Sequence, residues 1–324
     1  MPSSLLLMNS IASLTLAMVF SAWSALFHSS AAGYQAAPHR PSPERTGSQP
    51  HRESAQPVTQ RYSDRQGLDH YGLQEATEYT MARKQGWESG EAVSRWLQTA
   101  DGLVRGRRDI LSIIARLSTA FVADRPTILD LGCGHGDVTA EILKIRPHAS
   151  IWMVDFSDEM IRLARERFSD NENIKVIKHD LNGGIPDELL SIEFDQVVSC
   201  FAIHHVEYEN RVGLYADIRR VLSEDGLFVN GDRFIGESPV VSKWEFDNWI
   251  AWMTKQIKNE LGIDEIFDHA KRTQMERDEK MGDKPGTLWD MQEDLRQADF
   301  QYVDCMWKSH NLGVIVATKG QRTF

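Results

Sequence analysis

Between residues 127 and 233 the sequence alternates short apolar runs with segments whose apolar residues recur at helical spacing. The apolar runs are TILDLG, SIWMVDF, IKVIKHD, FDQVVSCFAI and GLFVNGD, and the segments between them include VTAEILKI, DEMIRLARERF and NRVGLYADIRRVL. This alternation is typical of parallel strands whose connecting helices cover both faces of one sheet. We therefore predict an α/β fold built on a doubly wound, mostly parallel sheet.

The segments on either side of this core are also periodic. Residues 92–117 carry apolar residues at helical spacing and predict one or two amphipathic helices. After the fifth strand, a helical insertion is predicted at about 237–286, and two closely joined strands near the carboxyl end predict an antiparallel hairpin. Within the insertion, Phe246, Trp249 and Met253 share one helical face. That face either packs on the core or forms a lid over a ligand, and both can hold together.

The first 60 residues differ in composition from the rest. Residues 1–39 contain no Lys, Arg, Asp or Glu, and the apolar stretch at 4–27 is long enough to cross a bilayer core of roughly 30 Å as a helix. A membrane anchor, a processed targeting peptide and a start codon assigned too far upstream all remain open. Residues 34–60 resemble a disordered linker. We predict a leader and linker at 1–60 and one folded domain at 61–324.

Charge and cysteine content limit the partners. The net charge of -11 argues against a nucleic-acid backbone as the partner and favours a small-molecule ligand. The three cysteines are far apart and form neither a disulfide framework nor a zinc site, so no metal is predicted. Arg40, Arg45 and Arg52 follow the apolar stretch, and positive charge there would keep the downstream domain in the cytosol. The oligomeric state is open.

The loop after the first strand, in ILDLGCGHGD, indicates the kind of ligand. A dinucleotide fingerprint would place a small residue where Asp137 stands, and a carboxylate beside a diphosphate would be repulsive. Asp155 ends the second strand, where a carboxylate can accept both hydroxyls of a ribose. Asp180 ends the third strand, near an adenine edge in such a layout. A nucleoside-sized ligand without phosphate fits these residues, and S-adenosylmethionine is one.

The motifs ILDLGCGHGD, VDFSDEMI, HDLN, FDQVVSCFAIHHV and RVLSEDGLFVNGD occur in this order at the expected intervals, and the chain resembles the class I S-adenosylmethionine-dependent methyltransferases. The resemblance covers about residues 92–319 and implies a Rossmann-like sheet with S-adenosyl-L-methionine as cofactor. It also implies a set of cofactor contacts. These are Asp130 and the backbone of Gly132, Cys133 and Gly134 at the methionine portion, Asp155 at the ribose, Phe156, Asp180 and Leu181 at the adenine, and Phe201 near the methyl group.

His204 and His205 follow the fourth strand at the edge where the methyl group should point. An acceptor OH or NH must lose a proton, and an imidazole suits that role. His205 is the favoured base, because it is less expected to share the inward direction of the strand. In the alternative, one histidine orients a loop and the other fills space. The sequence does not identify the acceptor, which we predict to be a small molecule.

Two other functions remain open. The tail NLGVIVATKG is similar to the ending of carboxy-S-adenosyl-methionine synthases, which share this fold and modify the cofactor itself. The stretch AKRTQME, with Arg272, loosely resembles the segment with which that family holds the new carboxylate. The glycine loop and the insertion length differ from that family. The chain could also bind the cofactor or a partner without turnover. Production of S-adenosylhomocysteine with an acceptor would separate these hypotheses.

Overall fold

The computed structural model describes residues 87, 89–120, 124–261 and 266–320. The predicted leader and linker lie outside the described residues, so the predictions about them stay untested. Within the described part, none of the helices combines the length and the apolar character that a membrane crossing requires.

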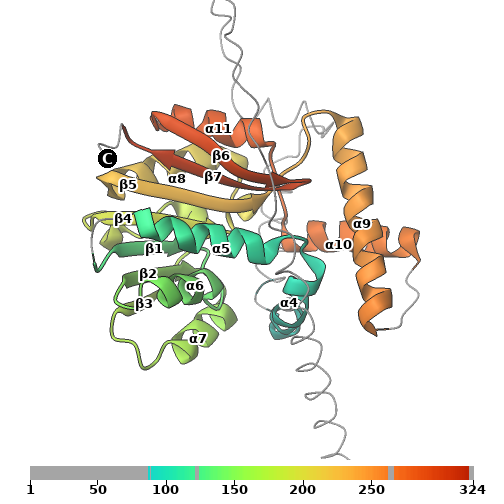
Figure 1. The fold of residues 1–324 in the computed structure, drawn as a ribbon, viewed down its shortest axis with the longest axis horizontal. Coiled ribbons are helices and arrows are strands. Elements are labelled where there is room, and N and C mark those ends of the chain that lie inside the picture. Colours follow the sequence, from blue (N-terminus) through green and yellow to red (C-terminus); the bar gives the residue numbers. More distant parts are fainter. Residues whose placement is uncertain (1–86, 88, 121–123, 262–265, 321–324) are drawn as a thin grey trace, which may run out of the picture. The chain divides into compact units, whose positions relative to one another are not determined.

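Within the described residues, seven strands form one sheet in the order β3-β2-β1-β4-β5-β7-β6 (Figure 1). They are β1 (Thr127–Leu131), β2 (Ser150–Asp155), β3 (Ile174–Lys178), β4 (Phe194–Cys200), β5 (Leu222–Arg233), β6 (Tyr302–Ser309) and β7 (Leu312–Thr318). Strands β1 to β5 pair in parallel, and β7 runs antiparallel to both β5 and β6. This confirms the predicted mostly parallel sheet with an antiparallel hairpin at its carboxyl end.

The strand order reverses between β1 and β4, because the chain moves from β1 outward to β3 and then returns to pair β4 with β1. In open α/β sheets, ligands bind outside the carboxyl ends of the strands at such a switch point. The glycine loop follows β1, and His204 and His205 follow β4. The topology therefore brings both sequence motifs to the same crevice.

Helices cover both faces of the sheet (Figure 1). The helices α5 (Arg107–Leu117), α6 (Asp137–Ile145) and α7 (Asp158–Arg167) lie over one face, and α8 (Tyr208–Val221) and α11 (Leu288–Gln297) lie over the other. Successive strand residues alternate between the two cores: Ile128 packs on the α5 side, and its neighbour Leu129 packs on the α8 side. Both faces are apolar, which explains the nearly continuous apolar strands of the sequence.

The chain enters the sheet through α4 (Gly90–Leu103) and α5, which meet at Gly106. Gly106, the residue directly before α5, has a φ of 82°, a left-handed conformation that a continuous right-handed helix excludes, so the periodic segment forms two helices. Short 3₁₀ turns complete the domain, at Ser118–Ala120, Leu181–Gly183, Asp187–Leu189 and Ile203–His205.

The insertion between β5 and β6 forms α9 (Pro239–Leu261) and α10 (Phe267–Met281). The two helices share a small core of Ile250, Met253 and Ala270, separate from the two cores that flank the sheet. Trp249 of α9 donates a hydrogen bond from its indole Nε1 to the carbonyl of Leu103 in α4, at 3.1 Å. The insertion thus contacts α4 beside the carboxyl ends of the strands.

Candidate active site

The glycine loop is held tightly between neighbouring strands. The backbone amides of Gly132 and Cys133 both donate to the carbonyl of Val154 in β2, at 2.7 and 3.0 Å. Gly132 has a φ of +65°, and a Cβ there would lie 2.1 Å from the Cβ of Ala202. A side chain at this position would collide with the segment that follows β4. Glycine is therefore required for the close approach of the loop after β1 to that segment.

Asp155, at the end of β2, is held in a fixed orientation. One carboxylate oxygen accepts from the backbone amide of Gly134 at 2.9 Å, and the other accepts from the amide of Ser157 at 2.9 Å. The residue is only 8% exposed. Ser157 also caps α7 by accepting from the amide of Met160. The carboxylate thus ties the glycine loop to the start of α7.

A first cavity, with about 870 Å³ of empty space open to solvent, lies against this loop. Eight of the nine predicted cofactor residues line it: Gly132, Cys133, Gly134, Asp155, Phe156, Asp180, Leu181 and Phe201. Asp180 is also held in place, because one of its oxygens accepts from the backbone and side-chain nitrogens of Asn182, both at 3.0 Å. The strand ends therefore place two oriented carboxylates and two apolar side chains, Phe156 and Leu181, around one nucleoside-sized space.

Asp130 differs from the other predicted residues because it does not line this cavity. It is fully buried, and its Oδ2 accepts a hydrogen bond from the hydroxyl of Thr139 in α6 at 2.7 Å. Burial raises the pKa of Asp130 to about 7, although the bond from Thr139 opposes the shift. Its contact in this structure is with α6, and its predicted contact with the methionine portion stays a prediction.

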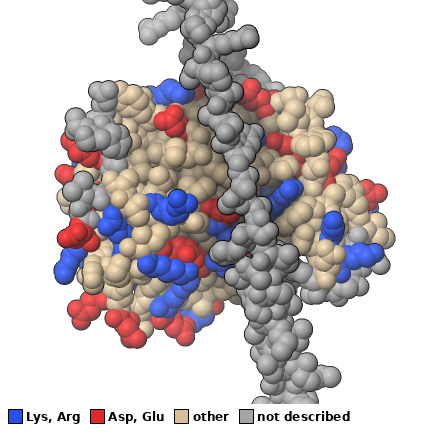
Figure 2. Space-filling view, in the orientation of Figure 1, with Lys and Arg blue, Asp and Glu red and all other residues tan. Residues whose placement is uncertain are grey.

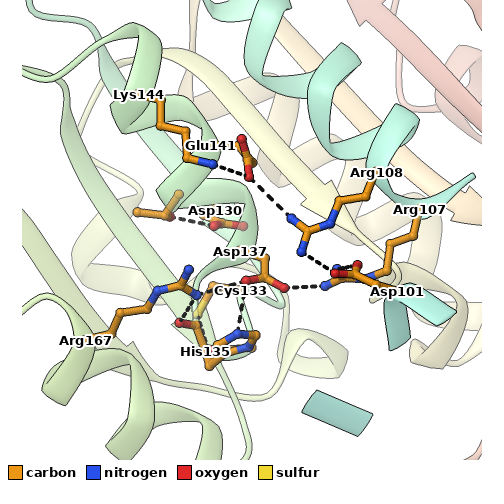
Figure 3. Close-up of polar contacts among 12 residues, drawn as sticks. Asp101, Arg107, Arg108, Asp130, Cys133, His135, Asp137, Glu141, Lys144 and Arg167 are labelled. Atoms are coloured by element: carbon orange, nitrogen blue, oxygen red, sulfur yellow. Dashed lines mark hydrogen bonds and ion pairs between the residues drawn. The ribbon is translucent and has the colours of Figure 1, made fainter. Parts of the chain in front are cut away.

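Asp137 lies at the centre of an ion-pair network at the cavity rim (Figure 3). Its carboxylate pairs with Arg107 of α5, with Arg167 of α7 at 2.9 Å and with His135 at 3.0 Å. Burial alone would raise its pKa, but hydrogen bonds from His135 and Arg107 hold the pKa of Asp137 well below its usual range. The sequence alone shows none of these partner cations. The partner cations weaken the argument that Asp137 would repel a phosphate.

A second cavity adjoins the first and has about 830 Å³ of empty space. The two cavities share four lining residues, Trp87, Trp96, Phe201 and His205. Residues from α4, α9 and α10 form the other side, among them Leu103, Trp249, Met253 and Gln274. Trp249 and Met253 also pack within the insertion. The aromatic face of α9 therefore both packs and lines a cavity.

The two histidines occupy different positions in this arrangement. His204 lines the second cavity and not the first, and its Nδ1 lies 2.5 Å from a carboxylate oxygen of Asp232 at the end of β5. Burial alone would lower the pKa of His204, but Asp232 and Asp283 raise it to about 9. His205 lines both cavities, and its ring meets that of Trp87 edge to face. Burial and the charge on His204 lower the pKa of His205 to about 3.

Sequence patterns did not point to four charged residues beside the histidines. Asp232 holds His204, and Arg233 pairs with both Asp278 and Asp283 of the insertion. Asp232 carried a usable signal, because it ends a strand in GLFVNGD as Asp155 does in SIWMVDF. Asp283 follows α10 in a charged stretch without periodicity, and no sequence signal marks it.

Comparison with known proteins identifies the framework. Residues 128–226, from β1 into β5, match a family described as a methyltransferase domain. The chain carries a class I S-adenosylmethionine-dependent methyltransferase domain. The matched region contains the glycine loop, Asp155, Asp180 and both histidines, and it ends before the insertion. The match therefore covers the framework of the first cavity and leaves out α9 and α10.

Curated relatives extend over more of this methyltransferase. A carboxy-S-adenosyl-L-methionine synthase of Hamiltonella defensa subsp. Acyrthosiphon pisum is 26% identical over 239 residues, which cover 67% of this chain and 82% of the relative. A ubiquinone/menaquinone biosynthesis C-methyltransferase UbiE of Bordetella avium is 24% identical over 199 residues, covering 60% of this chain and 75% of the relative.

A solved structure described as "PigF with SAH" is similar in fold, with a TM-score of 0.50 and 13% identity over 74% of this chain. The aligned part spans 62% of that protein. The likeness supports the Rossmann-like sheet at the level of fold.

Proposed function

We propose that this methyltransferase transfers the methyl group of S-adenosylmethionine to a small molecule bound in the second cavity. The observation that carries the proposal is the shared wall of Trp87, Trp96, Phe201 and His205. Methyl transfer is an in-line displacement, so donor and acceptor must meet end to end with little between them. Two adjoining cavities with a common wall provide that geometry.

The residues of the first cavity fit S-adenosylmethionine. The buried, oriented carboxylate of Asp155 can accept the ribose hydroxyls, while Phe156 and Leu181 offer apolar surfaces for the adenine. Among the described residues, a Cβ at Gly134 would have only the Met160 sulfur within 4 Å, at 3.7 Å, so this part of the loop backbone can be approached by a ligand. When bound, the cofactor supplies the activated methyl group, and the protein orients it.

The second cavity favours an acceptor with an apolar or aromatic body. Leu103, Trp249 and Met253 supply apolar surface from α4 and α9. His205 is placed at the shared wall to accept a hydrogen bond from an acceptor OH or NH. Once an oxygen has taken the methyl group, its remaining proton is strongly acidic, so a neutral imidazole can accept it even with a low pKa.

A second candidate is synthesis of carboxy-S-adenosylmethionine, because the 26% identical relative carries that name and the tail resembles that family. In this candidate a cation must hold the new carboxylate beside the sulfonium. Arg272 of α10 is exposed and lines neither cavity in the described part of the chain. Arg277 of the same helix and Arg233 do line the second cavity, so the labelling experiment below separates this candidate from methyl transfer.

We infer that the partner is not a nucleic acid and that the catalytic part works in the cytosol, with membrane contact through residues 4–27. Figure 2 shows acidic and basic side chains interspersed on one face of the described residues, which supports an uncharged or weakly charged small acceptor over a polyanion. Cell fractionation of the full chain, compared with a chain starting at residue 61, tests the membrane contact. Equal recovery of both in the soluble fraction would contradict it.

The decisive experiment uses S-adenosylmethionine labelled in its methyl group. The full chain is incubated with it and a metabolite extract, and mass spectrometry follows the label. We expect S-adenosylhomocysteine and a labelled small molecule, and we expect Asp155→Ala to abolish both at low cofactor concentration. A cofactor that gains a carboxylate without losing its methyl carbon would favour the second candidate. Cofactor binding without S-adenosylhomocysteine with any acceptor would favour a binding protein without turnover.

A further inference from the structure

His204, His205 and Asp283 form a compact cluster at the wall of the second cavity. One ligand atom from each residue lies within 4.8 Å of the others. The Nδ1 of His205 lies 3.4 Å from Oδ1 of Asp283, and the Nε2 of His204 lies 3.7 Å from the same oxygen. Both histidines are buried, so the cluster is largely shielded from solvent.

We propose that these three residues bind a divalent transition-metal ion, through Nε2 of His204, Nδ1 of His205 and Oδ1 of Asp283. Two imidazoles and one carboxylate are a donor set that zinc, cobalt and ferrous iron accept, whereas magnesium prefers oxygen alone. With metal–ligand bonds of about 2.1 Å, the ligand atoms of a tetrahedral site lie about 3.4 Å apart. The 3.4 and 3.7 Å separations are close to that edge length.

The surrounding contacts orient the ligands as in known metal sites. The other ring nitrogen of His204, Nδ1, lies 2.5 Å from Asp232 and is directed by it. A carboxylate in this position fixes the ring and leaves Nε2 for the metal. Likewise, the second oxygen of Asp283 pairs with Arg233 at 2.5 Å, which leaves Oδ1 facing the histidines. A charged residue on the side away from the proposed ion thus orients each of these two ligands.

The local charge also suits a dication. Asp232, Asp278 and Asp283 contribute three carboxylates to this network, and Arg233 is the cation that pairs with the two from the insertion. Counted without the histidines, these four groups carry two net negative charges, and His204, whose pKa is raised to about 9, offsets one of them in the metal-free protein. Buried charges need compensation, and a divalent ion between the histidines and Asp283 supplies it.

This inference departs from our sequence expectation that no metal is bound. That expectation rested on the cysteines, which stand apart from one another. The proposed ligands come instead from the 3₁₀ turn after β4 and from the end of the insertion. His205 and Asp283 are 78 residues apart in the sequence. Separation of this size hides a site from spacing rules, which find ligands that are close in sequence.

An ion here would act on the acceptor side of the enzyme. All three ligands line the second cavity, so coordination positions that the protein leaves open are accessible from it. An acceptor hydroxyl or carboxylate bound there would be fixed in place, and the ion would lower the pKa of a bound hydroxyl. His205 would then be a ligand, and the bound ion would take over the proton-releasing role proposed above.

The test measures metal binding without cofactor or acceptor, so its outcome does not depend on methyl transfer. The full chain is stripped with chelator and titrated with Co²⁺ in the presence of excess Mg²⁺, while the visible absorption of bound cobalt is recorded. We expect saturable binding that Zn²⁺ displaces and Mg²⁺ does not. Asp283→Asn should weaken the binding on the order of 100-fold, and Asp232→Asn by about 10- to 100-fold.

Asp278→Asn is the matched control, because it removes the same charge from the same partner, Arg233, without removing a proposed ligand. Cobalt binding in this variant should stay close to wild type. Thermal unfolding of each variant with and without Zn²⁺ checks that it folds, and only variants that keep the site should be stabilised by the metal. A wild-type chain without saturable Co²⁺ absorption would overturn the proposal. So would an equal loss of binding in Asp278→Asn and Asp283→Asn.

Discussion

The two cavities are built by different means. In the first, backbone conformation decides the shape: the loop at Gly132 lies against Ala202, and the amides of Gly134 and Ser157 orient Asp155. In the second, side chains from separate helices decide it, with Trp249 from α9 and the Arg233 ion pairs beside the histidines. The first therefore belongs to the sheet, whereas the second belongs to the insertion. This difference is expected when the cofactor site is built on a scaffold that many proteins share and the acceptor site is particular to one protein.

The largest expected effect comes from adding one carbon to the first cavity. In Gly132→Ala, the new Cβ would lie 2.1 Å from the Cβ of Ala202, and the loop must move. Binding of S-adenosylmethionine, measured by calorimetry, should weaken by more than about 100-fold, since several loop contacts are lost together. The double variant with Ala202→Gly removes the colliding atom and should recover part of the affinity. If the single variant binds like wild type, the loop is not as tightly held as described.

The second effect tests the oriented carboxylate. Asp155→Ala removes charge-assisted hydrogen bonds worth about 1.5 to 3 kcal/mol, so S-adenosylmethionine should bind roughly 10- to 100-fold more weakly. Circular dichroism should show an intact fold. Asp180→Ala offers a comparison at the neighbouring strand end, where one carboxylate oxygen binds Asn182. Tighter cofactor binding in Asp155→Ala would refute the ribose assignment.

A change in the second cavity should leave the first unaffected. Trp249→Ala removes an indole that lines the acceptor side and lies under the guanidinium of Arg233, at 5.5 Å. With an acceptor found in the labelling experiment, its KM should rise roughly tenfold, or about 1.4 kcal/mol, while cofactor affinity stays unchanged. Trp249→Phe keeps part of the apolar surface, so its KM for the acceptor should lie between the values of wild type and Trp249→Ala. An equal loss of cofactor affinity would erase the distinction between the cavities.

The smallest effect concerns the rim network and depends on pH. The pKa of Asp137 is depressed in the folded state, so its contribution to stability is fully present above its unfolded pKa of about 3.9 and is lost progressively as pH falls from there towards the lower folded pKa. Asp137→Asn should thus be less stable than wild type at neutral pH, by about 1 to 2 kcal/mol. Urea unfolding at several pH values should show the gap closing below about pH 4. A constant gap would mean that the network does not depend on this charge.

The fold could be predicted because local patterns determine it. Alternating apolar runs predicted which segments form strands and that the sheet is mostly parallel, and the strand ends carry Asp155 and Asp180, which line one cavity. Asp137 shows the limit of this reasoning, since its partners Arg107 and Arg167 lie 30 residues away on either side and nothing in the sequence pairs them. Asp283 shows the same limit within the insertion, because its position depends on how α10 packs.

A crystal structure with S-adenosylhomocysteine tests the central claim most directly, namely that cofactor and acceptor occupy the two adjoining cavities. The account predicts the adenosine in the first cavity, with ribose oxygens within hydrogen-bond distance of Asp155 and the adenine against Phe156 and Leu181. The sulfur should point to the wall formed by Phe201 and His205. Adenosine in the second cavity, or a sulfur directed away from that wall, would contradict the account.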